Sequence, residues 1–478
     1  MLRRRRRERV QGPAGSVDTA RWSGWSRRCA TGRRPEDVRR LLAALRVAAV
    51  QGPPQDRAAA LAALEAEPAL LVLLLDRYAR PAGAAAARRP AQPAGRAARH
   101  ERDRGRPERP RPDRAADLLG ALLAALDADG RVRQEGVTAL AALGGALAAA
   151  VLAVRAADWA PGVREAAAAA LAARTEPSEA AAVVGVLLRT AGRQRAAGPA
   201  AAYRAALAEP VHRRAVRALA AAADPPVRRF GVELALDLGE YVRGDLLRSA
   251  LHDRDQVCGR LCAQRLLELD PELAGRLLWA RAAGVRELAV GALPADVPAT
   301  RLVGPLADRA RMVRAQARWK LYQRDEPPAE VYRRQLRKAA KNGAQPRLLA
   351  GLAAGLGECG DAADAALLAR LLRDPAPAVR RAAVRAVGRL AKPYELVPLL
   401  GPLANDPDPG TAREVFEALV RVPGEVPPET VWIGRTRPEP AVRRLAERVA
   451  ARNSAVKAER QAADVSRAEC GPGAERGA

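Results

Sequence analysis

The stretch that decides the fold is DPAPAVRRAAVRAVGRL, residues 374–390. It opens with an Asp-Pro pair, and the pair Val379-Arg380 follows shortly after. Ala383 and Val387 stand four and eight residues after Val379, so the three side chains share one face of a helix. An Asp just before such a pattern can cap the incoming helix by accepting its free backbone N–H groups. The stretch therefore predicts a short amphipathic helix with an acidic residue at its start.

The same pattern recurs along residues 115–453 with a period of roughly 31 residues. The Val-Arg pair, hereafter the anchor, occurs as Val132-Arg133, Val163-Arg164, Val227-Arg228, Val285-Arg286, Val313-Arg314, Val379-Arg380 and Val442-Arg443. Weaker copies lie at Val257-Cys258, Pro346-Arg347 and Arg413, and one repeat is blurred near Arg195. An Asp stands five residues before several of these anchors, at Asp127, Asp158, Asp308, Asp374 and Asp406. The spacing predicts about eleven helical hairpins that bury their apolar faces by stacking on their neighbours.

The composition indicates the same fold class. Ala, Leu and Arg dominate and are strong helix formers, whereas aromatic residues make up only 3% of the chain. We therefore predict an all-α protein built as an α-solenoid. In such a stack the anchor arginine can reach the Asp of its own or the neighbouring repeat and form a ladder of ion pairs. The alternative is that the arginines contact a ligand.

Residues 374–390 resemble the HEAT-repeat family, in particular the short HEAT-like repeats of the phycobilin-lyase type. The segment has the Asp-Pro pair, the Val-Arg pair and the spaced Ala and Val residues of those repeats. The resemblance covers roughly residues 115–453, and it implies a right-handed superhelix of hairpins with an extended concave surface. It leaves the function open, because such repeats serve scaffolds, adaptors, nucleic-acid binders and a few enzymes.

Four further segments flank or precede the array. We expect residues 1–34, rich in Arg, Gly and Ser, to be a disordered basic N-terminus, and residues 454–478 to be a disordered C-terminal tail. Residues 35–80 carry three apolar helical patterns and are expected to form a short helical segment, either an extra repeat or a cap. Residues 81–114 contain no Leu, Ile, Val or aromatic residue, so we expect a disordered Pro/Arg-rich linker.

The charge and the cysteines bear on the partner and the compartment. The net charge of +27 is compatible with solubility alone or with a polyanionic partner. The five cysteines are scattered and odd in number, which argues against a disulfide framework and favours a cytoplasmic location. No apolar stretch follows the basic residues 3–7, so we expect no secretory signal. Residues 136–154 are uncharged, but they fit the repeat register as two helices joined by a Gly turn, so we expect no membrane span.

The sequence singles out no catalytic, cofactor-binding or metal-binding residue. Cys258 and Cys262 lie four residues apart with His252 nearby, but a zinc site needs a fourth ligand, so we interpret both thiols as core residues. A Walker loop and a Gly-x-Ser-x-Gly elbow are both missing from the sequence. The glycines around Gly355 lie in a helical pattern with no preceding strand, and we interpret them as packing or turn glycines.

A basic cluster at residues 311–341 is the main candidate site. The candidate polyanion-binding residues are Arg311, Arg314, Arg318, Lys320, Arg333, Arg334, Arg337, Lys338 and Lys341. The candidates for stacking on bases are Trp319, Tyr322 and Tyr332. Four of the cations recur at helical spacing and form one stripe, which can bind phosphates while aromatic rings stack on bases. The alternative is a solvated helix face with the aromatic rings in the core.

Three hypotheses about function follow. We favour a non-enzymatic scaffold or adaptor, a monomer that holds another protein on the concave face without cofactor or membrane. The second hypothesis is a nucleic-acid-binding protein, related to DNA repair, that grips phosphates with the basic cluster. The least favoured hypothesis is a lyase-type enzyme, for which the sequence identifies no catalytic residue.

Overall fold

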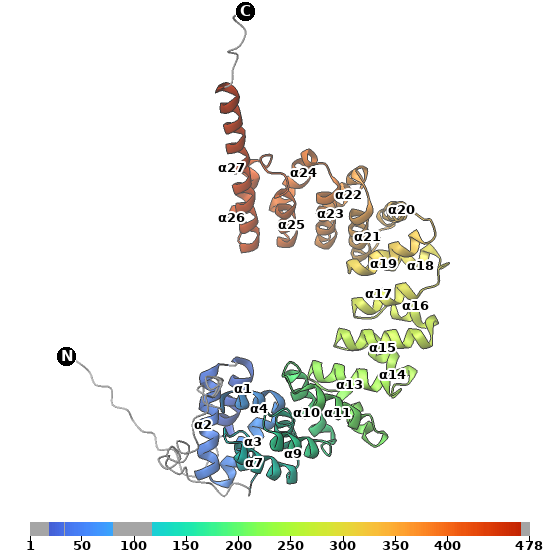
Figure 1. The fold of residues 1–478 in the computed structure, drawn as a ribbon. Helices are drawn as coiled ribbons and strands as arrows, with labels where there is room; N and C mark the ends of the chain where they lie inside the picture. Colours follow the sequence, from blue (N-terminus) through green and yellow to red (C-terminus); the bar gives the residue numbers. More distant parts are fainter. Residues whose placement is uncertain (1–18, 33, 80–116, 470–478) are drawn as a thin grey trace, which may run out of the picture. The chain divides into compact units, whose positions relative to one another are not determined.

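A computed structural model describes residues 19–32, 34–79 and 117–469 of the chain (Figure 1). Within these ranges the chain forms α-helices joined by short turns and 3-10 turns, without any β-strand, which confirms the all-α prediction. Close contacts divide the chain into two units, residues 1–242 and 243–478. Residues 1–18 and the expected linker, 81–114, lie outside the described residues.

The first unit consists of a helical segment followed by successive hairpins. Its helices are α1 (Thr19–Gly32), α2 (Pro35–Gln51), α3 (Pro54–Glu65), α4 (Pro68–Ala79), α6 (Leu118–Ala125), α7 (Gly130–Ala142), α8 (Ala146–Arg155), α9 (Pro161–Leu171), α10 (Pro177–Thr190), α11 (Ala197–Leu207), α12 (Arg213–Ala220) and α13 (Pro225–Asp237). Several of them begin with Pro, whose missing N–H and fixed φ suit the first helical position.

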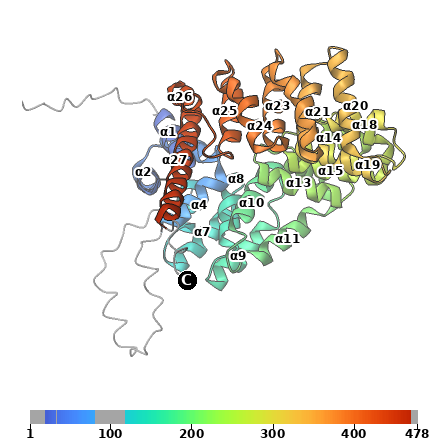
Figure 2. The same ribbon diagram turned by 90° about the horizontal axis from the view of Figure 1, so that it is seen from above.

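The second unit is a stack of hairpins in two rows of helices (Figure 1). Its helices are α14 (Arg243–His252), α15 (Gln256–Leu269), α16 (Ala274–Leu277), α17 (Ala283–Ala292), α18 (Ala299–Leu306), α19 (Arg311–Tyr322), α20 (Pro328–Lys341), α21 (Pro346–Cys359), α22 (Ala365–Ala369), α23 (Pro377–Leu390), α24 (Pro393–Leu400), α25 (Pro409–Leu419), α26 (Pro428–Thr436) and α27 (Pro440–Glu469). The odd-numbered helices carry the anchors and form one row, in which α21, α23 and α25 stand side by side (Figure 2). This stacking confirms the predicted α-solenoid, whereas the number of repeats stays a prediction.

The small residue four positions after an anchor has a steric role in the first unit. A Cβ atom on Gly136 would lie 2.3 Å from the backbone nitrogen of Ala125, and one on Gly231 would lie 2.3 Å from that of Ala220. Only glycine fits at these two positions, because α6 and α12 approach the backbones of α7 and α13 so closely.

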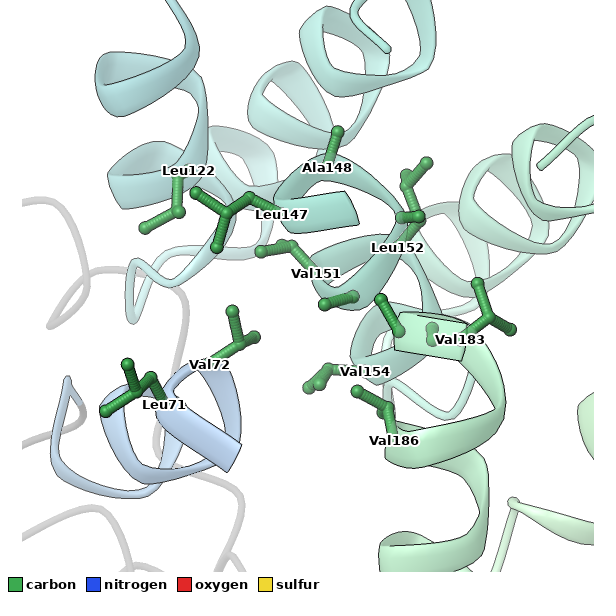
Figure 3. Packing of buried hydrophobic residues seen from close by; sticks show 14 of the residues in the cluster. Leu71, Val72, Leu122, Leu147, Ala148, Val151, Leu152, Val154, Val183 and Val186 are labelled. Carbon is green, nitrogen blue, oxygen red and sulfur yellow. The ribbon is translucent and has the colours of Figure 1, made fainter. Parts of the chain in front are cut away.

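Residues 35–79 pack directly on the hairpins of the first unit. Leu71 and Val72 of α4 lie against Val151 and Val154 of α8, beside residues of α10 such as Val186 (Figure 3). All of these side chains are buried in one continuous core. The segment is therefore attached to the array through an apolar face, as the expected cap or extra repeat requires.

A buried ionic network reinforces this attachment. Arg155 at the end of α8 is 1% exposed, and it forms ion pairs with Asp76 of α4 and Asp158 of the following turn. Asp158 also forms an ion pair with Arg133 of α7 at 3.1 Å, and Asp76 forms one with Arg193 at 3.5 Å. Burial raises the pKa of Asp158, but the hydrogen bond from the following turn and the two arginines outweigh it and hold that pKa below its ordinary value. The carboxylate therefore stays ionised in the core.

Both ends of the chain differ from the sequence-based expectation. Residues 19–32, expected to be disordered, form α1, because Trp22 and Cys29 are buried and the Trp22 indole N–H donates to Asp56 at 2.7 Å. Residues 454–469, expected to belong to a disordered tail, continue α27 as a helix. Just before these residues, Asn453 of α27 holds the turn between α25 and α26. Its side chain accepts a hydrogen bond from the Gly424 N–H at 2.7 Å and donates one to the Val426 carbonyl at 2.8 Å.

The uncharged residues 136–154 form the end of α7, a turn and α8, as the repeat register predicts. Gly145 in that turn has a φ of 100°, a conformation that favours glycine. Among the described helices none is long and apolar enough by itself to cross a membrane, and the bent pair α3 and α4 reaches that length and composition only when taken together.

Candidate functional site

The anchor arginines bind the turn that precedes their own helix. In Arg133, Arg286 and Arg380 the guanidinium Nη1 donates to the carbonyl oxygens six and five residues earlier, at 2.9–3.1 Å. These carbonyl groups belong to the turns between the two helices of each hairpin. The arginine therefore fixes the shape of the turn, which explains why it recurs with the repeat.

The predicted ladder of ion pairs forms in part. Arg133 pairs with Asp158 at 3.1 Å, Arg286 with Asp308 at 2.6 Å, and Arg380 with Asp406 at 2.8 Å. In each case the carboxylate belongs to the corresponding turn of the next repeat. These arginines already have carboxylate partners, so they are structural residues rather than ligand contacts.

The predicted capping role of these carboxylates needs a correction. Asp158, Asp308, Asp374 and Asp406 each accept from the backbone N–H two residues later, at 2.7–3.0 Å, and that N–H precedes the helix. They therefore close the turn between the helices, as Asp side chains commonly do, rather than cap the helix itself. The side chain of Asp408 does cap a helix, by accepting from the Thr411 N–H of α25.

The ladder is interrupted between α19 and α21. The position five residues before the Pro346-Arg347 anchor is Lys341, so Arg314 meets no carboxylate there. Arg314 instead forms an ion pair with Glu358 of α21, which also accepts from Arg318 at 2.7 Å. Burial raises the pKa of Glu358, but the hydrogen bonds from the two arginines outweigh it and lower that pKa overall.

The stacking of helices is interrupted at the same place. In the part of the chain that the structure describes, α19 and α21 do not pack along their length, unlike α17 with α19 or α21 with α23. Instead α21 approaches the end of α18, where a Cβ atom on Gly351 would lie 1.9 Å from the Ala307 carbonyl oxygen. The glycine that brings α21 onto α18 is therefore the cause of the interruption that the sequence contains.

A groove of about 1060 Å³ opens at this interruption, hereafter the arginine groove. Residues of α17, α18, α19, α21 and α23 line it, together with the turns before α17 and α19. The charged lining residues are Arg286, Arg301, Arg309, Arg314, Arg347, Arg381, Arg385, Arg389, Asp308 and Glu358. Both carboxylates are already paired with arginines, so the groove carries a marked excess of positive charge. Trp279 stands at its edge with 86% of its surface exposed.

Several groove arginines are available to a ligand. The side chains of Arg301, Arg347 and Arg389 form no ion pair or hydrogen bond with the described residues. Arg385 has only a distant carboxylate, that of Glu414 at 3.9 Å, and burial raises the pKa of this glutamate. Such side chains can turn toward an anionic partner without breaking a strong bond.

The basic cluster predicted at residues 311–341 is divided by the structure. Arg314 and Lys320 are buried, and Lys320 donates to the Leu293 carbonyl at 2.7 Å. Arg318 is held by Glu358, and Arg333 is held by Glu330, Asp361 and Asp364 at 2.6–2.8 Å. The exposed members of the cluster are Arg311, Arg334, Arg337, Lys338 and Lys341.

The three aromatic candidates also separate. Tyr332 is fully buried, and its hydroxyl donates to the Leu306 carbonyl at 2.9 Å, so its predicted role in stacking is wrong. It is buried because Gly355 of α21 leaves room for its ring. Trp319 and Tyr322 are more than half exposed and are accessible to a ligand. None of the residues on α20 lines the arginine groove, so the predicted stripe and the groove are separate surfaces.

Other predicted features of the site agree with a structural role. Cys258 and Cys262 are buried thiols, as interpreted from the sequence. No group of three or more metal-ligating side chains comes together in the described ranges. Residues 355–360 have the spacing Gly-x-Gly-x-x-Gly, but they lie at the end of helix α21, where Gly355 and Gly357 pack against Tyr332 and Ala386. They do not form the strand-to-helix turn that binds a dinucleotide.

Comparison with known families identifies the repeat. Residues 365–463 match the family model described as HEAT repeats. The chain therefore contains HEAT repeats over these residues. This confirms the resemblance found in residues 374–390, and the finer assignment to the phycobilin-lyase type stays a prediction. A search among curated proteins found no match to the HEAT-repeat chain.

Solved structures with a similar arrangement include a crystal structure of a Kap121p mutant, with 12% identity and a TM-score of 0.33. The match covers 90% of the HEAT-repeat chain and 53% of that protein. A crystal structure of importin beta has 14% identity and a TM-score of 0.32, and the match covers 92% of the chain and 59% of importin beta. The HEAT-repeat chain thus spans between half and two thirds of the length of these proteins.

The arginine groove was missed by the sequence analysis, although part of its signal was present. Arg381, Arg385 and Arg389 recur at intervals of four residues, which places them on one face of α23. That signal was hidden because the same segment supplied the repeat pattern. Trp279 and Arg301 come from other repeats, and only the fold shows that they belong to the same groove.

Proposed function

We propose that this HEAT-repeat protein is a non-enzymatic scaffold that holds a protein partner in the arginine groove of its second unit. The observation that supports it is the combination of an exposed Trp279 with several arginines that lack strong partners. Trp and Arg are the residues that most often dominate the energy of protein interfaces.

Photo-crosslinking from inside the groove tests this proposal. Trp279→p-benzoylphenylalanine is introduced into the full chain, and Trp432→p-benzoylphenylalanine serves as a matched control, because Trp432 is 66% exposed on α26 and lies outside the groove. We expect a protein that crosslinks at position 279 and not at position 432, and whose purified form binds the Trp279→Ala variant at least ten-fold more weakly than the native chain. Identical crosslinked products at both positions, or equal affinity for the variant, would refute the proposal.

A second candidate function is nucleic-acid binding through α20. The observation that favours it is that Arg334, Arg337, Lys338 and Lys341 are exposed at helical spacing and form no ion pair within the described ranges. The test is the affinity of the full chain for labelled single- and double-stranded DNA and RNA at several salt concentrations. Binding that weakens steeply with salt, and that is lost when the four cations are replaced by Glu, supports this candidate. Weak binding that the replacement leaves unchanged excludes it.

A further inference from the structure

The arginine groove has a charge pattern that selects among protein partners. Its arginines outnumber its carboxylates eight to two, and both carboxylates are already neutralised, Asp308 by Arg286 at 2.6 Å and Glu358 by Arg318 at 2.7 Å. Arg381 and Arg385 have further carboxylates beside the groove, Asp408 at 3.4 Å and Glu414 at 3.9 Å. A basic or neutral segment would still leave Arg301, Arg347 and Arg389 without a counter-charge. Carboxylates are the groups that a guanidinium binds best among protein side chains, because the two planar groups can share two hydrogen bonds.

The spacing of the arginines indicates the shape of the partner. Arg381, Arg385 and Arg389 lie four residues apart on one face of α23, so they extend over about 12 Å. A helix with carboxylates four residues apart presents its charges at the same interval of about 6 Å. A row of this length corresponds to two to three turns of a helix. The length of the charged row therefore matches that of a short helix.

The floor of the groove suits the apolar face of such a helix. Ala354, Ala382, Ala386 and Pro305 line the groove with small apolar side chains beside the arginines. At this point α19 and α21 do not pack on each other, so the space is not filled by the chain's own neighbouring helix. Trp279 at the edge supplies a large exposed apolar surface. A single nucleic-acid strand would place its continuous phosphate charge beside Glu358 and Asp308 and would leave this floor without apolar contacts.

We propose that the arginine groove binds an acidic amphipathic helix of a partner protein, two to three turns long, with carboxylates at intervals of four residues opposite Arg381, Arg385 and Arg389. An apolar side chain of that helix packs against Trp279. This proposal rests on the proposed scaffold function and adds the chemical class of the partner.

The test is a selection from a displayed library of helical peptides with randomised surface positions, with the full chain as bait. We expect the selected peptides to be enriched in Glu and Asp four residues apart. The Arg385→Ala/Arg389→Ala double variant should bind them at least ten-fold more weakly, as measured by fluorescence anisotropy. The matched control is Arg444→Ala/Arg448→Ala, which removes two exposed arginines with the same spacing from α27 and should leave the affinity unchanged.

The outcomes separate this proposal from the scaffold function on which it rests. Selected peptides that are basic or neutral, or that bind both double variants equally, overturn the acidic-helix proposal. The scaffold function then still stands if a partner crosslinks at position 279. An oligothymidine of 20 nucleotides that binds more tightly than the selected peptides, and whose binding is lost in Arg385→Ala/Arg389→Ala, also overturns it and assigns the groove to nucleic acid. Failure of the crosslinking alone removes the scaffold function while the peptide chemistry remains measurable.

Discussion

Removal of the Asp76 carboxylate should loosen the N-terminal helical segment from the array. Arg155 is 1% exposed, and without Asp76 it keeps only Asp158, whose two oxygens already serve Arg133 and a backbone N–H. Removing one partner of a buried ion pair costs about 3–5 kcal/mol, because the remaining charge stays buried without full compensation. For Asp76→Ala this corresponds to an increase of about two to four orders of magnitude in the opening of the contact between α4 and α8.

Hydrogen exchange of the full chain, read by mass spectrometry, measures this effect. Peptides from α4 and α8 should exchange faster in Asp76→Ala, while peptides from the second unit serve as an internal reference. Glu65→Ala is the matched control, because Glu65 is an exposed carboxylate at the end of α3. An increase of less than three-fold in α4 and α8 would falsify the reasoning.

A double variant separates the cost of the buried charge from the loss of packing. In Asp76→Leu/Arg155→Leu both charges are replaced by apolar side chains, and Asp158 keeps Arg133 at 3.1 Å. Replacement of a whole buried ion pair by apolar residues is often close to neutral. We therefore expect exchange in α4 and α8 to return most of the way to that of the native chain. A double variant that is as loose as Asp76→Ala would show that charge compensation is not the cause.

Three further predictions concern acid stability, helix approach and thiol reactivity. The pKa of Asp158 in the folded chain lies below its ordinary value of 3.8, so the stability contributed by this carboxylate is complete above about pH 5 and is lost as the pH falls through the folded pKa. Asp158→Asn should lower the free energy of unfolding measured in urea at pH 7, and it should flatten the decline of that free energy in acid. An unchanged acid profile would contradict this. Gly351→Ala should destabilise the chain by about 1–3 kcal/mol, because the new Cβ would meet the Ala307 carbonyl. Gly275→Ala is the control and should leave the stability unchanged, because no atom lies within 4 Å of its new Cβ. Equal melting temperatures of the two variants would refute the steric argument. Burial raises the pKa of Cys262 to about 11, so only about one such thiol in a thousand is ionised at pH 8. Brief labelling with iodoacetamide should therefore modify Cys262 only after the chain is unfolded. Rapid labelling of Cys262 in the native chain would disprove its burial.

The fold could be predicted from the sequence because the repeat states the same local rule many times. Residues 374–390 contain the Asp, the anchor and the small residue that shape one hairpin, and the other copies place the same features at the same spacing. The ion pair between Arg380 and Asp406 could be predicted in the same way, because both residues hold fixed positions in the repeat.

The site could be predicted only in part. Exposed Trp319 and buried Tyr332 lie in similar sequence surroundings, and which of them is accessible depends on whether a neighbouring helix offers room, as Gly355 does for Tyr332. The arginine groove depends on a departure from regular stacking, in which Gly351 brings α21 onto the end of α18. A periodic pattern shows what its copies share, so a site formed where one copy differs is not visible in the pattern itself.

The ends of the chain show a related limit of composition. Residues 19–32 are rich in Arg and Ser, yet Trp22 and Cys29 are enough to dock α1 on the next helices. The contacts that order α1 are made with α2, α3 and α4, so its own composition could not reveal them.

The interruption between α19 and α21 has a mechanical consequence. In a stack of repeats, resistance to bending comes from the contact area between neighbours, because each repeat touches only those beside it. The row of odd-numbered helices in the second unit therefore has one compliant joint, between two stiffer blocks that begin at α15 and at α21. Arg314 and Arg318 cross that joint to Glu358, so two ion pairs on one carboxylate act as its tether. A force applied along the row would be relieved first at this joint. There the ion pairs and the contact of Gly351 with the end of α18 would give way before α17 and α19, or α21 and α23, separate.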